Sequence, residues 1–233
     1  MNIHIKILRR KGPDAPPFWQ TFLYETEETE ITVAAALEDL NSREPLTDIE
    51  GEQADPVQWE CNCLQKKCGA CAMLVNDFPV LACEEKLCGH GDTVVLEPLR
   101  KFPVVRDLIV DRSVMSENLK EMNVWLSREA DVSEDNQEEL FTASQCLQCG
   151  CCLEICTSYV DGTDFYGMSA LVPAARICGA QRDCGDGHMR ESCQTHIFEG
   201  CQGFNACEHV CPAGIPVTRL MAHMMQTYWP DRK

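Results

Sequence analysis

The chain has 233 residues, which is enough for two domains that each bury a core. Its 17 cysteines exclude a small secreted disulfide scaffold, which would be shorter and would hold an even number, and their density argues against idle thiols. The net charge of −17 argues against nucleic acid as a partner, because phosphates would repel the chain, although acidity also serves solubility.

Alternating and helical patterns divide the first hundred residues into strands around one helix. Residues 2–9 alternate apolar and polar side chains, which predicts a strand, and they lack the apolar core of a secretory leader. A Pro-rich loop at 12–17 predicts a hairpin connection to a strand over 18–26. Apolar residues at helical spacing predict a helix over 31–40 with Thr32 as its N-cap. Short strands are expected at 72–75, 80–82 and 93–97.

From about residue 104 the periodicity becomes helical. Residues 129–139 are polar and acidic, which indicates a solvated connection or an exposed helix face. Helices are expected over 162–178, interrupted near Pro173, and after Pro216, which suits the first turn of a last helix. Four further apolar residues share one helix face: Leu108, Met115, Leu119 and Met122.

This change of pattern sets a domain boundary near residues 100–106. We expect one domain over 1–103 and a helical domain over 104–233. No apolar run approaches the roughly 20 residues needed to cross a bilayer. The chain is therefore expected to be soluble, and any membrane contact is expected to come through a partner.

The first cysteine group has the plant-type spacing of a [2Fe–2S] site. Its members are separated by four, two and eleven residues: Cys63, Cys68, Cys71 and Cys83. Three thiolates on one tight loop can wrap a compact cluster, Gly69 lets the backbone approach it, and the fourth thiolate closes the cage. Zinc is the alternative, but zinc prefers paired knuckles and gains nothing from this pattern. Cys61 breaks the spacing and is treated as a non-ligand.

The second group is the run typical of bacterial ferredoxins. Its members are separated by two, two and three residues: Cys146, Cys149, Cys152 and Cys156. In two-cluster ferredoxins the first three cysteines hold one cubane and the fourth reaches across to the other. Cys151 adjoins Cys152 but is out of register. Thr157 stands where a proline is usual, which alters the turn beside Cys156.

The third group is a ferredoxin run that lacks one cysteine. It consists of Cys201, Cys207 and Cys211, followed by Pro212, and Phe204 stands at the middle cysteine position. A cubane with three protein thiolates cannot retain its fourth iron in the usual way, so a [3Fe–4S] cluster is expected; a degenerate second cubane is the alternative. The expected [3Fe–4S] ligands are Cys156, Cys201 and Cys207. The expected [4Fe–4S] ligands are Cys146, Cys149, Cys152 and Cys211.

Six cysteines remain without a role in this scheme. They are interpreted as small buried hydrophobes: Cys61, Cys88, Cys151, Cys178, Cys184 and Cys193. The segment 183–188 is rich in Gly and Asp but does not fit a calcium loop, and it is interpreted as a turn.

The order of these groups resembles the iron–sulfur subunit of the succinate dehydrogenase and fumarate reductase family. The resemblance covers nearly the whole chain. Residues 98–108 look like the family's linker between domains, and residues 211–214 with Thr218, Arg219 and His223 look like the stretch after the last cysteine. It implies an α+β fold, in which a β-grasp plant-type ferredoxin domain precedes an all-helical bacterial-ferredoxin-like domain.

The resemblance also implies partners and a location. A flavoprotein subunit with FAD would interconvert succinate and fumarate, and a membrane anchor would hold quinone and sometimes haem. Iron in three clusters would carry electrons between them, at the cytoplasmic face of the inner (plasma) membrane. No nucleophile–base pair, phosphate loop or carboxylate dyad stands out in this chain, so no catalytic residue is assigned to it.

Two residues are candidates near the quinone. The family often places a histidine after the first [3Fe–4S] cysteine, where this chain has Gln202, which can bond a quinone carbonyl but cannot supply a titratable proton. Arg219 is the second candidate, through its charge; a surface role is the alternative for both. Three other functions stay open: a subunit serving a flavoprotein that reduces another unsaturated acid, a free-standing ferredoxin, and a structural zinc protein.

Overall fold

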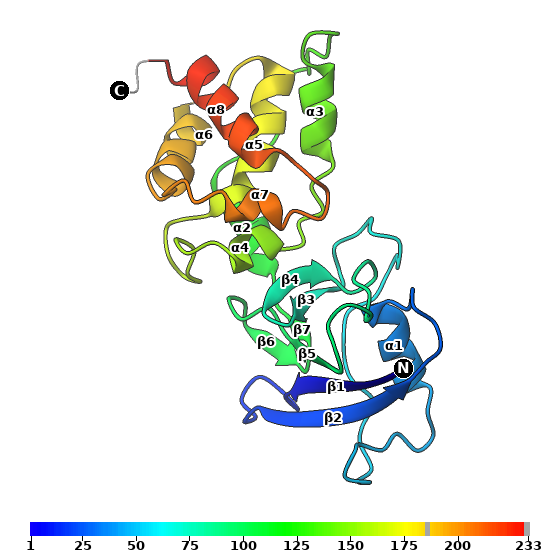
Figure 1. Ribbon diagram of the computed structural model, residues 1–233. Helices are drawn as coiled ribbons and strands as arrows, with labels where there is room; N and C mark the ends of the chain where they lie inside the picture. The colour runs from blue at the N-terminus through cyan, green and yellow to red at the C-terminus, as the bar shows by residue number, and fades with distance from the viewer. Residues whose placement is uncertain (185–186, 231–233) are drawn as a thin grey trace. The chain divides into compact units, whose positions relative to one another are not determined.

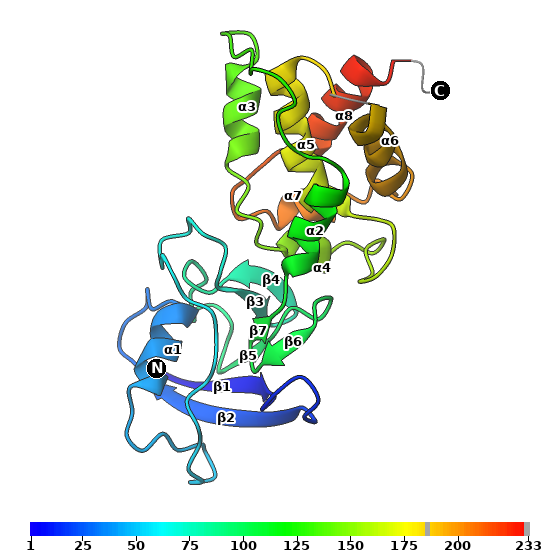
Figure 2. The ribbon, with the colours of Figure 1, turned by 180° about the vertical axis from the view of Figure 1, so that it is seen from behind.

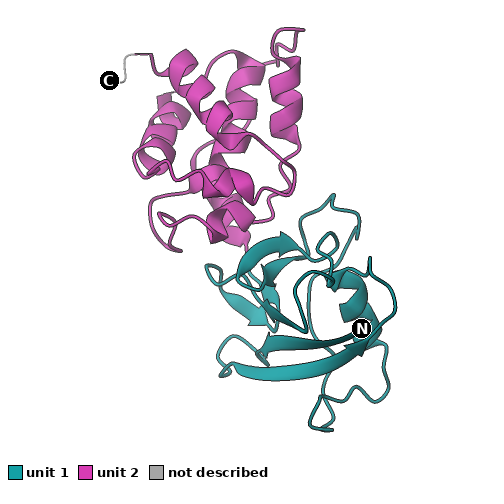
Figure 3. Cartoon of the chain, viewed as in Figure 1, with its two compact units in different colours: residues 1–111 teal, residues 112–233 magenta. Residues whose placement is uncertain are grey.

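The computed structural model describes residues 1–184 and 187–230. The chain divides into two compact units, here unit 1 (Met1–Asp111) and unit 2 (Arg112–Lys233) (Figure 3). The boundary lies after Asp111, whereas the sequence patterns place it after residue 103. Residues 104–110 form a hairpin that is bonded to the rest of unit 1, as described below.

Unit 1 is built on a mixed sheet beside one helix (Figure 1). The five strands of the sheet lie in the order β2-β1-β5-β3-β4, with β1 antiparallel to β2 and parallel to β5. β1 and β2 pair from Asn2↔Glu25 to Arg9↔Phe18, which confirms the expected hairpin. The elements are β1 (Asn2–Arg9), β2 (Phe18–Glu25), α1 (Val33–Asn41), β3 (Ala72–Val75), β4 (Phe78–Leu81), β5 (Thr93–Glu97), β6 (Val104–Arg106) and β7 (Ile109–Val110).

The helix α1 begins where its capping residue predicts. The Thr32 hydroxyl accepts a hydrogen bond from the Ala35 N–H at 3.2 Å, which satisfies one of the free donors of the first turn. The apolar face of α1 and alternate residues of β1 are buried in the core of unit 1, where each fully buried Leu or Ile contributes roughly 1.5–3 kcal/mol. These residues are Ile3, Ile5, Ile7, Val33, Ala36, Leu37 and Leu40.

A buried ion pair fastens the β6–β7 hairpin to the sheet of unit 1. Asp107 and Arg9 lie 2.8 Å apart, with 2% and 4% of their side chains exposed. The Asp107 carboxylate also accepts the backbone N–H groups of Arg10 and Gln58 at 3.0 and 2.9 Å. A buried charge pair is tolerated when its oxygens are satisfied in this way, and loss of one partner is costly. Leu108, expected on a helix face, lies between β6 and β7 and is buried in unit 1.

Unit 2 is helical (Figures 1 and 2). Its central helix contacts four other helices and a π-helix, and eleven of its fifteen residues are buried. A helix that is buried on all sides forms the core around which the others pack. The elements are α2 (Ser113–Glu121), α3 (Gln137–Ser144), α4 (Cys151–Glu154), the central α5 (Gly167–Gln181), α6 (Gly187–Cys193), the π-helix η1 (Gln194–Phe198), α7 (Ala206–His209) and α8 (Val217–Tyr228).

The central helix does not break at its proline, contrary to the sequence expectation. Pro173 lies inside α5 and has no N–H to donate to the carbonyl of Ser169, four residues earlier. That carbonyl instead accepts a hydrogen bond from the Gln148 side chain at 2.9 Å. A side chain from another segment thus supplies the donor that the helix lacks at this point.

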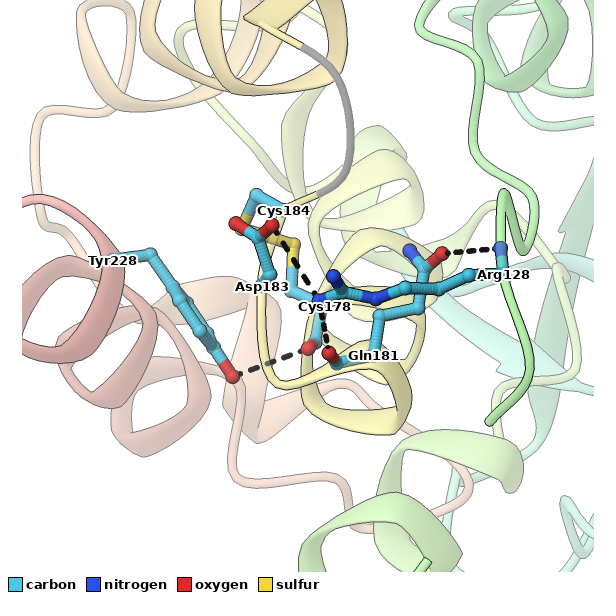
Figure 4. The surroundings of a disulfide bond; sticks show 6 residues. All are labelled: Arg128, Cys178, Gln181, Asp183, Cys184 and Tyr228. Carbon is cyan, nitrogen blue, oxygen red and sulfur yellow. Dashed lines mark hydrogen bonds and ion pairs between the residues drawn. A yellow bond between two sulfur atoms is a disulfide. The ribbon is translucent and has the colours of Figure 1, made fainter. Parts of the chain in front are cut away.

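A disulfide joins two cysteines that were interpreted as free thiols. Cys178 in α5 is bonded to Cys184, six residues later (Figure 4). Both are buried, and the Cys178 carbonyl accepts the Tyr228 hydroxyl of α8 at 3.2 Å. The side-chain oxygen of Gln181 accepts the Ser127 N–H at 2.8 Å. This short loop therefore fastens both α8 and the segment before α3 to the end of α5. The turn expected over 183–188 includes residues 185–186, which lie outside the described residues, and its last two residues begin α6.

Across the residues that the structure describes, none of the helices has the length and apolar character needed to cross a membrane.

Candidate functional site

The loop of the first cysteine group directs backbone N–H groups at sulfur. The N–H groups of Gln65 and Lys67 both donate to Cys63 Sγ, with N···S distances of 3.3 Å, and the Lys66 N–H donates to Cys83 Sγ at 3.3 Å. Positive φ angles at Leu64 (53°), Lys66 (58°) and Gly69 (75°) turn the loop so that successive N–H groups point inward. Such a loop favours negative charge on the sulfurs that it surrounds.

The hairpin of β3 and β4 brings the two ends of this group together. Cys71 immediately precedes β3, and Cys83 lies two residues after the end of β4. The Ala82 N–H donates to the Cys71 carbonyl at 3.1 Å, and the Cys71 and Cys83 thiols are hydrogen-bonded. Hydrogen bonds also join Cys68 to Cys63. The four thiols that the spacing selects therefore interact with one another in pairs, whereas Cys61 is exposed.

Two electrostatic effects act on the thiols of unit 1 in opposite directions. Backbone hydrogen bonds from Gln65 and Lys67 lower the pKa of Cys63 to about 7. Burial raises the pKa of Cys71 to about 12. The loop therefore favours the thiolate form of Cys63, whereas burial favours the protonated form of Cys71.

A mostly apolar cavity of about 290 Å³ in unit 2 is lined by cysteines of the second and third groups. Cys156, Cys201 and Cys207 all line it, with Cys152 at its wall. The charges of Cys156 and Cys201 act together on Cys207, and burial is the main reason that the pKa of Cys207 is raised to about 11. The structure thus brings Cys156 together with Cys201 and Cys207, and of the three cysteines that precede it in the motif only Cys152 lines the same cavity.

A second, smaller cavity of about 30 Å³ has the other four cysteines in its lining: Cys146, Cys149, Cys152 and Cys211. Cys211 joins the group from the far end of unit 2, between α7 and α8, and its charge acts on both Cys146 and Cys152. Burial and the neighbouring thiols raise the pKa of Cys152 well above its usual value. The two cavities share Cys152 and Cys207 in their linings and are therefore adjacent.

Two neighbours of the second group donate hydrogen bonds to its sulfurs. Gln148 Nε2 lies 3.2 Å from Cys146 Sγ. The side chain of Cys151 is fully buried and is hydrogen-bonded to Cys149, which lowers the pKa of Cys149 to about 7 and raises that of Cys151. Neither contact is expected from the sequence. The sequence indicates these two residues only by their position between the motif cysteines. The motif spacing specifies the cysteines and places no requirement on the residues between them.

Two residues at and near the position of the missing cysteine line the larger cavity. Phe204 and Gln202 both line it, and Phe204 is 68% exposed. Arg219 is not among the described residues that line this cavity. It lies exposed on α8, where its charge helps to lower the pKa of Glu208. Of the two quinone candidates, Gln202 is therefore the one beside the cavity.

The donor sets of the three groups fit iron–sulfur clusters better than other cofactors. Each group offers only thiols as ligands, and N–H groups approach sulfur in the first two. No group of three or more His, Cys, Asp or Glu side chains within the described residues is arranged to hold a metal ion directly. The case for clusters therefore depends on the composition of the loop and of the two cavities.

Comparisons with known proteins agree with this chemistry. Residues 4–117 match a family model described as a 2Fe-2S iron-sulfur cluster binding domain. The chain is 31% identical to the succinate dehydrogenase iron–sulfur subunit of Bacillus subtilis over 95% of this chain and 90% of that protein. It is 30% identical to the fumarate reductase iron–sulfur subunit of Escherichia coli over 70% of this chain and 71% of that protein.

A solved structure shares the fold. A chain of the Mycobacterium smegmatis Sdh1 complex in the apo form superposes with a TM-score of 0.75, covering 98% of this chain and 97% of that one, at 19% identity. The mixed α/β architecture is thus that of a known protein along its full length. Together with the two relatives, this shows that the chain belongs to the family of iron–sulfur electron-transfer subunits of succinate dehydrogenase and fumarate reductase oxidoreductases.

Proposed function

We propose that this chain relays electrons between a flavoprotein subunit that holds FAD and a quinone site in a membrane anchor. It would act as the iron–sulfur subunit of a quinone-linked fumarate reductase or succinate dehydrogenase at the cytoplasmic face of the membrane. Unit 1 would be a β-grasp ferredoxin-type domain and unit 2 a bacterial-ferredoxin-like domain. Family membership supports this role, and substrate chemistry would take place on the flavoprotein.

The proposed ligands follow from the groups described above. Cys63, Cys68, Cys71 and Cys83 would hold a [2Fe–2S] cluster; Cys146, Cys149, Cys152 and Cys211 a [4Fe–4S] cluster; and Cys156, Cys201 and Cys207 a [3Fe–4S] cluster. When bound, these clusters would supply one-electron redox chemistry. The protein would fix their spacing, bury the second and third, and donate hydrogen bonds to sulfur.

One observation carries the proposal furthest: the exchange of cysteines between the last two motifs. Cys156 belongs to the second motif by sequence but lines the cavity with Cys201 and Cys207. Cys211 belongs to the third motif but lines the cavity with Cys146 and Cys149. This exchange is the arrangement expected for two neighbouring clusters in a ferredoxin-like unit.

A substitution at the missing ligand tests the cluster assignment. Phe204→Cys supplies a fourth thiolate beside the larger cavity, so the oxidised variant should lose the [3Fe–4S] signal in electron paramagnetic resonance and gain about one iron per chain. Phe204→Ala is the matched control, because it removes the ring without adding a thiolate and should keep the signal. Persistence of the [3Fe–4S] signal in Phe204→Cys, with the cysteine shown to be unmodified, would refute the assignment.

The quinone contact is tested separately. Gln202 can donate a hydrogen bond to a quinone carbonyl, so Gln202→Leu should raise the apparent KM for quinone in the purified complex while the cluster signals stay unchanged. Arg219→Gln should change the same KM only if its charge reaches the quinone.

Assays with succinate, fumarate and other unsaturated acids identify the substrate of the flavoprotein partner. If the complex acts only on another unsaturated acid, the chain serves a related flavoprotein reductase instead of a fumarate reductase or succinate dehydrogenase.

A further inference from the structure

Gln148 occupies a strained position between two proposed cluster ligands. It stands between Cys146 and Cys149 with a φ of 50°, a left-handed conformation that few non-glycine residues adopt. Its side-chain nitrogen Nε2 lies 3.2 Å from Cys146 Sγ and 2.9 Å from the Ser169 carbonyl oxygen. A primary amide has two N–H donors, so one Nε2 can serve both acceptors at once.

The second acceptor is available because of the proline in α5. In a regular helix the Ser169 carbonyl would accept the N–H of residue 173, but Pro173 has none. Ser169 is only 4% exposed, and a buried carbonyl without a donor costs free energy comparable to a lost hydrogen bond. Gln148 supplies that donor. Pro173 therefore frees the carbonyl that holds the Gln148 amide in place.

The other amide hydrogen then has a fixed direction. With one N–H held by the Ser169 carbonyl, the remaining N–H of Gln148 is directed at Cys146 Sγ. A contact to Ser169 alone would make Gln148 a packing residue. The contact to sulfur gives it a chemical effect as well, because hydrogen bonds to a cluster's sulfurs stabilise the more negative, reduced form and raise its reduction potential.

We propose that Gln148 is a positioning residue that raises the reduction potential of the cluster bound by Cys146, by donating a hydrogen bond to that sulfur, and that Pro173 supports it by freeing the Ser169 carbonyl. The inference rests on the proposed ligand assignment of Cys146. It goes beyond that assignment because it gives a redox role to two residues that are not ligands.

The direct test replaces the amide by a group of similar length without N–H. Gln148→Met in the complex should shift the one-electron equilibrium of this cluster five- to tenfold toward the oxidised form, and tenfold corresponds to about 59 mV. The midpoint potential is measured by a redox titration followed by electron paramagnetic resonance. Gln145→Met is the matched control: it also flanks Cys146, but its amide contacts the Phe141 carbonyl and the Ser144 hydroxyl, and the potential should not move.

A second variant keeps the test decisive if Gln148→Met fails to retain the cluster. Pro173→Ala restores an N–H that competes for the Ser169 carbonyl, so it should shift the potential in the same direction by a smaller amount. Where Gln148→Met does retain the cluster, the double variant should show no further shift in potential, because both changes act through one contact.

The outcomes separate this inference from the proposed function. An intact cluster signal with an unmoved potential in Gln148→Met overturns the inference alone, as does an equal shift in Gln145→Met. An unmoved potential in Pro173→Ala overturns the supporting role of the proline. Absence of a [4Fe–4S] signal in the unmodified complex would instead overturn the proposed ligands.

Discussion

In unit 1 the predicted ligands lie on one loop and one hairpin, and backbone N–H groups approach their sulfurs. In unit 2 they come from segments that are distant in the sequence, and the cavities they line are mostly apolar. The pKa of Cys63 is about 7 because of the loop N–H groups, whereas that of Cys207 is about 11, mainly because of burial. The first group is therefore a local structure, and the others exist only when the helices of unit 2 have packed.

The largest expected effect comes from removing one ligand in each unit. Cys83→Ala should reduce the iron content by about two atoms per chain and leave the signals of the other clusters unchanged. Cys211→Ala should remove about four, and it should also perturb the neighbouring [3Fe–4S] signal, because the two cavities share walls. Iron analysis and electron paramagnetic resonance measure both. If Cys211→Ala, like Cys83→Ala, left the signals of the other clusters unchanged, the contrast between a local site in unit 1 and a packed site in unit 2 would be wrong.

The next largest effect is expected from breaking the buried ion pair that holds the β6–β7 hairpin to the sheet of unit 1. Asp107→Ala leaves Arg9 buried without its partner and should lower the free energy of unfolding of unit 1 by about 3–5 kcal/mol. Asp77→Ala is the control, since Asp77 pairs with Arg100 at the surface and should cost about 0–1 kcal/mol. Denaturant unfolding of both variants gives the comparison. A cost for Asp107→Ala as small as that of the surface variant would show that the hairpin is held by other contacts.

The elements that the sequence predicted well are those determined by neighbouring residues. The first hairpin follows from strand alternation, and the start of α1 follows from Thr32. Local patterns capture these features because each depends on a few adjacent side chains. The ligand sets, including the exchange of Cys156 and Cys211, stay predictions of the spacing rules.

The features that the sequence did not reveal depend on contacts between distant segments. Pro173 leaves the Ser169 carbonyl without its helical donor, and Gln148 supplies one from a different part of the chain. Cys178 and Cys184 lie at a spacing with no motif, and only the turn after α5 brings them together. The bond between Asp107 and Arg9 joins residues far apart in the sequence, and no local pattern indicates it.

The two units also differ in covalent cross-linking: the one disulfide found among the described cysteines lies in unit 2. The double variant Cys178→Ala/Cys184→Ala should lower the free energy of unfolding by about 2 kcal/mol through the freed loop, and amide exchange in α8 should become faster because Tyr228 loses a fixed acceptor. Cys193→Ala, a buried free cysteine, controls for the loss of a sulfur from the core. Alkylation of Cys178 or Cys184 in native, unreduced protein would contradict the bond itself.

The smallest expected effect concerns the start of α8, which lines the larger cavity. The Glu208 carboxylate accepts the Thr218 N–H at 2.8 Å, and this hydrogen bond lowers the pKa of Glu208. Glu208→Ala removes the acceptor and should cost about 0.5–1 kcal/mol at neutral pH, at the low end for a helix cap because the group is partly exposed.

The pH dependence of that difference follows from the direction of the pKa shift. The folded-state pKa of Glu208 is lowered, so its stabilisation is present above the unfolded value of about 4.3 and is lost as the pH falls through the folded value. Thermal unfolding of both chains between pH 7 and pH 4 should show a constant difference above about pH 5 that shrinks below it. A difference that grows as the pH falls would mean that Glu208 repels charge near the cluster thiolates rather than capping α8.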